Sequence, residues 1–447
     1  MLAFLRRPPV MAIIIAGCLV SLLGYGIRAS FGLFLEPMTV TRGWDRETFA
    51  LAMAIQNIIW GLGVPVAGAL SDRFGPIVVM VTGAIAYALG MYAMSIVEAQ
   101  VMLYLVGGLV TGLGVAFSSF SLAMAAMAKV VSPEQRSLAM GAGASAGSFG
   151  QVLFSPLSLV FIEQYGWEQA LVILGLISLA IVPLALLLPK GSSPSGGALP
   201  EHQQSLKSAL AEALSHRGYV LLTAGFFVCG FHVSFIGVHF PAYVEDQGLS
   251  ASVGAYALSI VGLFNIVGAF MGGWFGQKYS KKSTLSVIYL LRGFVIAFLV
   301  LSPPTELTMY TFAVCMGMLW LSTVPLTNAI VGELFGMQWL ATLFGVVFLS
   351  HQVGSFLGIW LGGYMYDATG SYDFVWWSGV VLALVAAILH WPIDETPVAR
   401  LTGGAAAVTA TPAQKLRGAP ERDYASIAVI ATGAVMIAIS VAMQLLR

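Results

Sequence analysis

Residues 10–38 read VMAIIIAGCLVSLLGYGIRASFGLFLEPM, which is apolar throughout except for one internal arginine and one acid near its end. A membrane-spanning helix needs ~20 apolar residues, so this stretch predicts a span. It contains no Lys or Asp, and its one acid is Glu36. Arg28 lies well inside it, where a charged side chain costs roughly 2.5–3.5 kcal/mol on insertion scales. This cost predicts that Arg28 faces a polar cavity and not lipid.

Apolar stretches of similar length recur along the whole chain. The sequence is 58% hydrophobic and 9% charged, with a mean hydropathy of +0.89, whereas soluble domains carry about 25% charged residues. These values predict an all-α membrane protein with twelve transmembrane helices, at 10–36, 46–70, 76–96, 101–128, 138–162, 167–189, 218–243, 252–276, 283–302, 307–331, 338–365 and 374–392. A thirteenth membrane helix, spanning the bilayer or lying bound to it, is expected at 425–446, which holds no charged residue.

The distribution of Lys and Arg predicts the topology. In a twelve-span arrangement, fifteen of the 20 Lys and Arg residues lie in loops on one side, and only Arg42 and Arg46 lie on the other. Because Lys and Arg are enriched in cytoplasmic loops, the N-terminus and the 190–217 loop are expected in the cytoplasm, with the spans in the inner membrane. The formal net charge of zero gives no sign of nucleic-acid binding.

The polar 190–217 segment divides the chain into two parts. We expect an N-terminal six-helix bundle at 1–189, a cytoplasmic linker at 190–217 and a C-terminal six-helix bundle at 218–395. A flexible linker at 396–424 and the extra helix at 425–447 follow. The two bundles repeat a loop, Gly68-Ala-Leu-Ser-Asp72-Arg73-Phe-Gly75 and Gly273-Trp-Phe-Gly-Gln277-Lys278-Tyr-Ser280. Parallel halves of this kind place a substrate site near the bilayer midplane.

The first copy of this loop resembles the cytoplasmic motif G-x-L-x-D-R-x-G of the major facilitator superfamily. The resemblance extends over the twelve spans, from residue 1 to about 395, and implies transport by alternating access. It also implies that Asp72, within the gating motif of Gly68, Asp72, Arg73 and Gly75, caps a neighbouring helix end and stabilises one gating state. The alternative is that Asp72 and Arg73 simply end a helix at the lipid headgroups.

A narrower resemblance lies in the fifth span. The stretch Arg136-Ser-Leu-Ala-Met-Gly-Ala-Gly143-Ala-Ser-Ala-Gly147-Ser-Phe-Gly150 is similar to the signature of the monocarboxylate transporters, near the branch of the oxalate–formate antiporters. This implies transport of a carboxylate. Two departures leave proton coupling open: Gly24-Tyr25-Gly26 replaces an acidic first-helix motif, and the eighth span carries only Asn265 where the family has an Asp–Arg pair. Gly143 and Gly147 are expected to let helices pack closely.

Two intramembrane arginines are the first candidates for substrate binding. Arg28 and Arg292 each lie inside a span, and no span holds an acid in its central third to neutralise them. The missing counter-ion points to an anionic substrate. Tyr25 precedes Arg28 by one helical turn and shares its face. The alternatives are that Arg28 extends to the membrane surface and that Arg292 pairs with a polar group of a neighbouring helix.

Further candidates are polar or aromatic residues of other spans. His351, with Ser355 one turn on, could bind an anion when protonated and could carry a coupling proton; alternatively it is a neutral histidine that packs helices. The remaining predicted substrate-binding residues are Gln56, Asn57, Trp60, His232 and Asn328.

The sequence favours secondary transport of a small organic anion, a mono- or dicarboxylate, by a monomer in the lipid bilayer. Symport with a proton, exchange and facilitated diffusion all stay open. No spacing typical of a metal site occurs, no phosphate-binding loop is present, and no cofactor is expected. Efflux of an amphipathic drug or metabolite is the alternative. An enzyme or sensor is disfavoured because the longest non-spanning segments, 190–217 and 393–424, are short and of low complexity.

Overall fold

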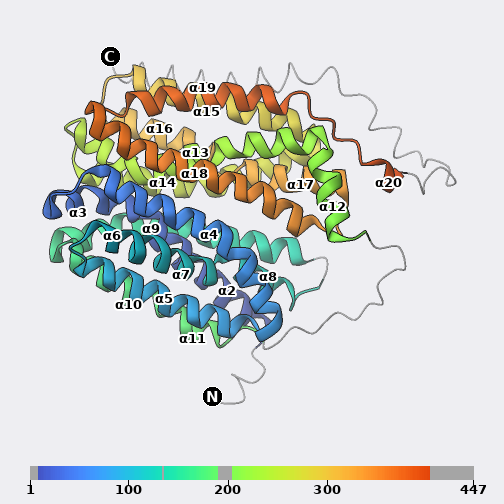
Figure 1. Ribbon diagram of the computed structural model, residues 1–447, viewed down its shortest axis with the longest axis horizontal. Coiled ribbons are helices and arrows are strands. Elements are labelled where there is room, and N and C mark those ends of the chain that lie inside the picture. Colours follow the sequence, from blue (N-terminus) through green and yellow to red (C-terminus); the bar gives the residue numbers. More distant parts are fainter. Residues whose placement is uncertain (1–8, 133–134, 190–203, 403–447) are drawn as a thin grey trace. The chain divides into compact units, whose positions relative to one another are not determined.

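The structure is a computed structural model that describes residues 9–132, 135–189 and 204–402 (Figure 1). Within these residues all regular elements are helical, and 12 segments are long and apolar enough to cross a membrane. The predicted all-α fold with twelve transmembrane helices is therefore confirmed. The helix expected at 425–446 lies outside the described residues.

The first six spans contain several interrupted helices. The first, fourth and sixth spans are each assembled from consecutive pieces, and the second, third and fifth are single helices. The elements are α2 (Val10–Ala29), η1 (Phe31–Phe34), α3 (Leu35–Arg42), α4 (Arg46–Phe74), α5 (Pro76–Ile96), α6 (Gln100–Leu103), η2 (Tyr104–Val110), α7 (Thr111–Phe117), α8 (Phe120–Ala128), α9 (Arg136–Tyr165), α10 (Trp167–Ser178) and α11 (Ile181–Ala185). Gly75, with φ of 87°, adopts the left-handed conformation that joins α4 to α5.

The last six spans follow a short helix that precedes them. Only the tenth span is interrupted, between α16 and α17. The elements are α12 (Leu206–Ser215), α13 (Arg217–Asp246), α14 (Ala251–Lys278), α15 (Lys281–Leu301), α16 (Glu306–Leu319), α17 (Thr323–Phe335), α18 (Leu340–Thr369), α19 (Asp373–His390) and α20 (Ala399–Thr402).

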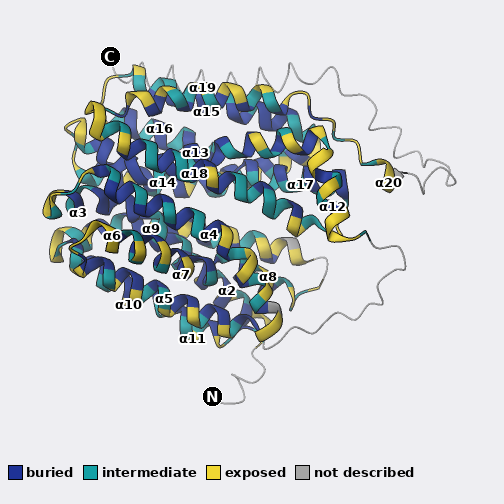
Figure 2. Cartoon of the chain, viewed as in Figure 1, coloured by how far each residue is buried: buried dark blue, intermediate teal, exposed yellow. Residues whose placement is uncertain are grey.

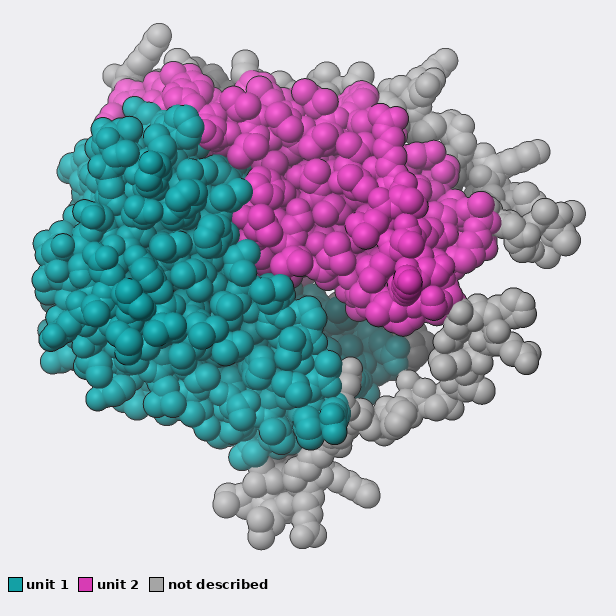
Figure 3. Space-filling view, viewed as in Figure 1, with its two compact units in different colours: residues 1–197, 231–266, 355–375 teal, residues 198–230, 267–354, 376–447 magenta. Residues whose placement is uncertain are grey.

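The described helices form two compact units (Figure 3). Unit 1 contains residues 1–197, 231–266 and 355–375, and unit 2 contains 198–230, 267–354 and 376–447. The first six spans thus share a unit with one end of α13, α14 and α18. The predicted bundles, 1–189 and 218–395, are defined by the repeat in the sequence, whereas the two units are defined by which helices pack together.

Glycines explain why the ends of α13 and α18 pack in unit 1 with the first six spans. A Cβ atom on Gly32 would overlap the carbonyl oxygen of Gly237 in α13. A Cβ atom on Gly363 of α18 would come within 2.7 Å of the Cα atom of Glu47 in α4. Small residues at helix contacts let backbones approach closely in a membrane. Without a side chain between them, the helices meet backbone to backbone.

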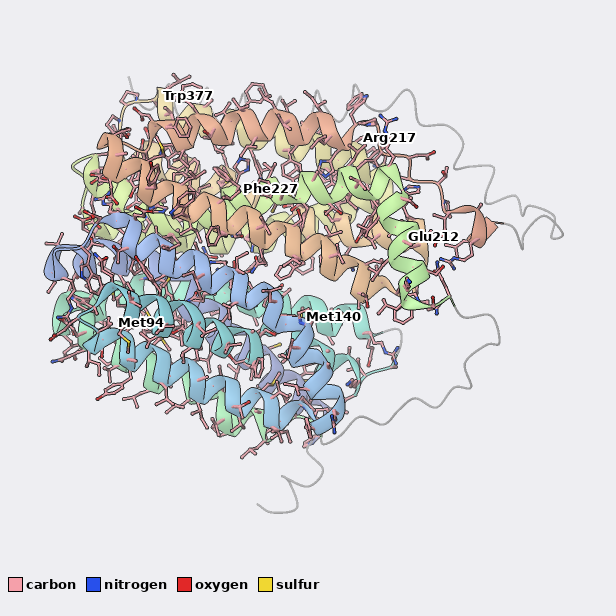
Figure 4. All side chains as sticks on the ribbon, in the orientation of Figure 1. Met94, Met140, Glu212, Arg217, Phe227 and Trp377 are labelled. Carbon is pink, nitrogen blue, oxygen red and sulfur yellow. The ribbon has the colours of Figure 1, made fainter. Side chains whose placement is uncertain are left out.

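The outer surfaces of the spans are apolar. Buried and exposed residues alternate along the helices (Figure 2). Leu138, Leu301 and Ile388 are among the large apolar side chains that remain exposed, and Trp377 of α19 is another (Figure 4). Helices with an apolar exposed face as well as an apolar buried face suit a lipid environment, where the outer surface contacts hydrocarbon.

Arg292 of α15 binds the interruption between α16 and α17 in unit 2. Its side chain is fully buried. Nε donates a hydrogen bond to the carbonyl oxygen of Leu319 at 3.1 Å, and Nη2 donates to the carbonyl oxygens of Leu319 at 2.6 Å and Trp320 at 2.5 Å. Carbonyls freed by a helix break need a partner inside the protein when the helix lies in a membrane. These contacts favour the structural alternative for Arg292.

We expect Arg292→Leu to lower the thermal stability of the purified protein, because three hydrogen bonds from a charged group are lost and each contributes roughly 1.5–3 kcal/mol. Arg292→Lys should restore part of the stability, since it keeps the charge but not the planar fork. Melting temperatures in detergent measure both effects, with the exposed Arg217→Leu as control. An Arg292→Leu protein that melts like the wild type but cannot transport would contradict the structural role.

Candidate functional site

Arg28 lies near the end of α2 and is half-buried in unit 1. Its Nη2 donates a hydrogen bond to Oδ1 of Asn57 on α4 at 2.5 Å. Its guanidinium carbon lies 4.5 Å from the centre of the Trp60 ring, also on α4. Both partners are neutral, and Arg28 takes part in none of the ion pairs within the described part of the chain. The cation is therefore positioned without being neutralised.

The backbone of α2 is fixed by a close contact with α9. A Cβ atom on Gly26 would lie 2.7 Å from the Cα atom of Gly150, and one on Gly150 would overlap the carbonyl oxygen of Leu22. This contact places Arg28, two residues further along α2, against α4. The Asn57 amide is itself oriented, because its Nδ2 donates to the carbonyl oxygen of Met53 at 2.8 Å. Its oxygen therefore faces the guanidinium.

Three aromatic side chains in contact with one another lie beside this arginine. The Phe120 ring contacts the Tyr25 ring at 6.1 Å and the Trp60 ring at 6.5 Å, both edge to face. The sequence did not predict Phe120. It begins α8 after the interruption at Ser118 and Ser119, and this serine pair between two apolar runs is the signal that could have indicated it. Four predicted residues, Tyr25, Arg28, Asn57 and Trp60, thus come together.

The other predicted residues of unit 1 are Gln56, His232 and Ser355, and their surroundings differ from those of Arg28. Gln56 is buried, and its Nε2 donates to the carbonyl oxygen of Gly107 in the π-helical segment η2 at 3.1 Å. It therefore bonds α4 to the fourth span, whereas Asn57 and Trp60 contact Arg28. His232 of α13 is buried beside the Phe231 ring, 6.2 Å away. Ser355 of α18 is fully buried.

Three predicted residues belong to unit 2, and two of them, Arg292 and His351, lie close enough to the buried Cys229 of α13 to interact with it. His351 of α18 is buried between the rings of Phe226 at 5.1 Å and Phe348 at 5.6 Å. Its Nδ1 lies 3.0 Å from Oε1 of Gln352. Asn328 of α17 is half-buried. Arg292 contacts the carbonyls of the helix break, as described above, and its Nη1 has no hydrogen-bond partner among the described residues.

The residues of the predicted gating motifs lie at helix ends and helix contacts. Gly68 faces open space, and Arg73 is exposed with its guanidinium carbon 5.1 Å from the Phe74 ring. Arg136 is exposed at the start of α9. The structure does not describe the side chain of Asp72. In the fifth span, a Cβ atom on Gly143 would approach the Met127 side chain to 2.6 Å, and one on Gly147 would contact the carbonyl oxygen of Ser21 at 3.6 Å.

The chemistry available around Arg28 is the binding of an anion. Its Nε is buried and has no hydrogen-bond partner within the described residues. A guanidinium with free N–H groups can donate two parallel hydrogen bonds to a carboxylate. Among the described residues, no group of three or more His, Cys, Asp or Glu side chains could hold a metal ion.

Comparison with known proteins shows the family. Residues 16–359 match the family described as Major Facilitator Superfamily. The chain is 28% identical over 354 residues to monocarboxylate transporter 13 of Rattus norvegicus, covering 79% of this chain and 81% of the relative. It is 24% identical over 384 residues to the uncharacterized MFS-type transporter YcxA of Bacillus subtilis (strain 168), covering 81% and 90%.

Solved structures show the same fold at low identity. A bacterial homolog to the human lysosomal transporter Spinster, in an inward-facing and unoccupied conformation, has a TM-score of 0.68 at 15% identity, over 86% of this chain and 95% of that one. A D-xylose-proton symporter has a TM-score of 0.67 at 16% identity, over 86% and 98%.

The twelve apolar spans, the loop motif after the second span and the match over residues 16–359 agree with one another. The superfamily expected from the sequence is confirmed: this chain is a multi-pass membrane protein and a transporter that belongs to the major facilitator superfamily.

Proposed function

We propose that this protein is a secondary transporter of small carboxylates and that Arg28 binds the carboxylate of the substrate. The observation that carries the proposal is a half-buried guanidinium held by an amide and an indole, with no carboxylate of the described residues paired to it. Several curated relatives are named monocarboxylate transporters, which supports this substrate class.

Charge balance favours one carboxylate over two at this group. Arg28 supplies a single positive charge, and its neighbours Asn57, Trp60 and Tyr25 supply none. A bound monocarboxylate would neutralise the guanidinium, whereas a dicarboxylate would bring a second charge that needs another cation. The second carboxylate would then stay hydrated or remain unpaired at a high cost. A monocarboxylate is therefore the better fit within the predicted class.

The aromatic side chains favour a substrate with an apolar part. Tyr25, Phe120 and Trp60 form a continuous series of ring contacts next to Arg28. Such rings would contact the hydrocarbon part of an organic acid while the guanidinium binds its charged end. The same rings are the observation that keeps a second candidate, efflux of an amphipathic drug or metabolite, in consideration.

The proposed orientation follows the distribution of Lys and Arg. The N-terminus and the 190–217 linker would lie in the cytoplasm, with the spans in the inner membrane. The protein would act as a monomer, by alternating access between the halves 1–189 and 218–395. The extra helix proposed at 425–447 would be peripheral to this unit.

The proposed carrier of a coupling proton is His351. Its surroundings support this role, because the Gln352 amide oxygen can accept a hydrogen bond from a ring N–H. The rings of Phe226 and Phe348 pack on its sides, and the Cys229 thiol is a further hydrogen-bonding partner. Exchange without protons is the alternative mechanism, and the two mechanisms differ in their dependence on pH.

Arg28→Ala should reduce kcat/KM for carboxylate uptake by roughly 100-fold or more. Two hydrogen bonds to a charged group contribute about 3 kcal/mol or more together, and each 1.4 kcal/mol is a factor of about ten. Arg28→Lys should recover little, because the planar fork is lost. Uptake of labelled lactate, pyruvate, oxalate and malonate into proteoliposomes measures the effect, with Arg217→Ala as the control. Near wild-type uptake by the alanine variant, at normal abundance, would assign Arg28 to the membrane surface.

If His351 carries the coupling proton, wild-type uptake should rise as the outside pH is lowered, because the proton gradient then drives transport. His351→Gln should flatten this dependence, since glutamine keeps a polar side chain but does not titrate. Initial uptake rates against pH in proteoliposomes test this, with His216→Gln, outside the spans, as the control. The same steep dependence in the His351→Gln protein would place the proton on another group or on the substrate.

A further inference from the structure

Arg46, the first residue of α4, is the centre of a dense group of polar contacts in unit 1. Its side chain is 8% exposed. Nη1 and Nη2 bind the two carboxylate oxygens of Asp246, the last residue of α13, at 2.6 Å and 2.8 Å. Nη2 also binds Oε2 of Glu36 on α3 at 2.6 Å. The guanidinium carbon lies 3.8 Å from the centre of the Tyr366 ring of α18.

A chain of hydrogen bonds continues from Arg46 into the second half of the sequence. Nη1 donates to the hydroxyl of Tyr372, between α18 and α19, at 3.0 Å. That hydroxyl lies 3.2 Å from Nδ1 of His239, and Nε2 of His239 lies 2.8 Å from the carbonyl oxygen of Ile359. A carbonyl only accepts, so Nε2 donates to it and Nδ1 accepts from Tyr372. Burial raises the pKa of Tyr372, although Arg46 opposes this, and the hydroxyl keeps the proton that it donates.

The start of α4 is held by a further acid of α18. The carboxylate of Asp367 accepts the backbone N–H groups of Arg46 at 3.1 Å and Glu47 at 2.6 Å. These groups have no partner within the helix, and an acid there also interacts favourably with the helix dipole. The Trp360 indole N–H donates to Oε1 of Glu47 at 2.8 Å. Residues of α13 and α18 thus bind the same end of α4.

Two backbone contacts lie close to this group. Gly32 meets the backbone of α13 at Gly237, and Gly363 meets α4 at Glu47. The Arg46 group adds charged contacts between residues up to 326 positions apart in the sequence. Its carboxylates are partly exposed, with 32% for Glu36 and 24% for Asp246, so water can hydrate them when the contact opens.

We infer that Arg46, Asp246, Glu36 and Tyr372 form a releasable lock, which holds this end of the first-half helices against α13 and α18 in one state of the transport cycle and opens in another. The inference rests on the alternating-access part of the proposed function and not on the identity of the substrate. Removing the charge of Arg46 or Asp246 shifts the protein toward the state in which these ends are apart.

Cysteine accessibility tests the lock without a substrate. The native cysteines, Cys18, Cys229 and Cys315, are first replaced by serine, and Val238→Cys is introduced. Val238 is 9% exposed on α13 beside Gly32, and cysteine is smaller than valine. A membrane-impermeant maleimide is applied to right-side-out and to inverted vesicles. We expect slow labelling with the lock intact, and about tenfold faster labelling from one face in Arg46→Gln and Asp246→Asn, which corresponds to about 1.4 kcal/mol.

Matched variants separate the lock from a general loss of structure. Asp45→Asn removes an exposed carboxylate next to Arg46 that forms none of these contacts, and it should label as slowly as the parent. The exchange Arg46→Asp with Asp246→Arg should return labelling toward the parent rate, which an unfolded protein would not do. Equal labelling in all variants, or no recovery in the exchanged pair when its melting temperature is normal, would overturn the inference. A wrong substrate assignment would change uptake and leave these labelling rates as expected.

Discussion

A polar group inside a bilayer must find its partner within the protein, and this constraint governs the arrangement of the arginines described here. Arg292 donates to main-chain carbonyls freed by a helix break. Arg46 binds two carboxylates and a phenol at the ends of the spans. Arg28 binds an amide and lies over an indole, both of them neutral. Each arginine has different partners, and the roles proposed for them differ accordingly: structure, a releasable contact and the binding of an anion.

The incomplete neutralisation of Arg28 gives a physical basis for coupling binding to conformational change under the proposed function. An unpaired guanidinium is costly to remove from water, whereas a guanidinium with a bound carboxylate is less so. A state that seals Arg28 away from water is therefore easier to reach with substrate than without it. The lock acts on the same conformational equilibrium at one end of the helices. When these helix ends separate, water hydrates the carboxylates of Glu36 and Asp246 in place of Arg46. Neither effect needs a conformational change within a helix.

Conformational change in this protein would alter helix–helix contacts, and several of these contacts are made by glycines. Gly26 and Gly150 join α2 to α9 within the first six spans, and their backbones touch directly. Gly32 and Gly363 make contacts of the same kind with α13 and α4. In lipid, helix association depends on close packing more than on hydrophobic burial, so small residues stabilise both sets of contacts. The difference lies in what accompanies them, since a single arginine, Arg28, lies near the first set and the ion pairs of Arg46 lie near the second.

The sequence by itself determined the spans and the superfamily, and it indicated all members of the group around Arg28 except Phe120. Hydropathy located the helices because a bilayer requires ~20 consecutive apolar residues in each. Helical periodicity placed Tyr25 on the same face as Arg28. The tertiary structure alone decided that Phe120 joins Tyr25 to Trp60, that Gln56 bonds to Gly107, and that Arg46 meets Asp246. These contacts join residues that are far apart in the sequence, and local periodicity describes only which face of its own helix a side chain occupies, not which helix lies opposite.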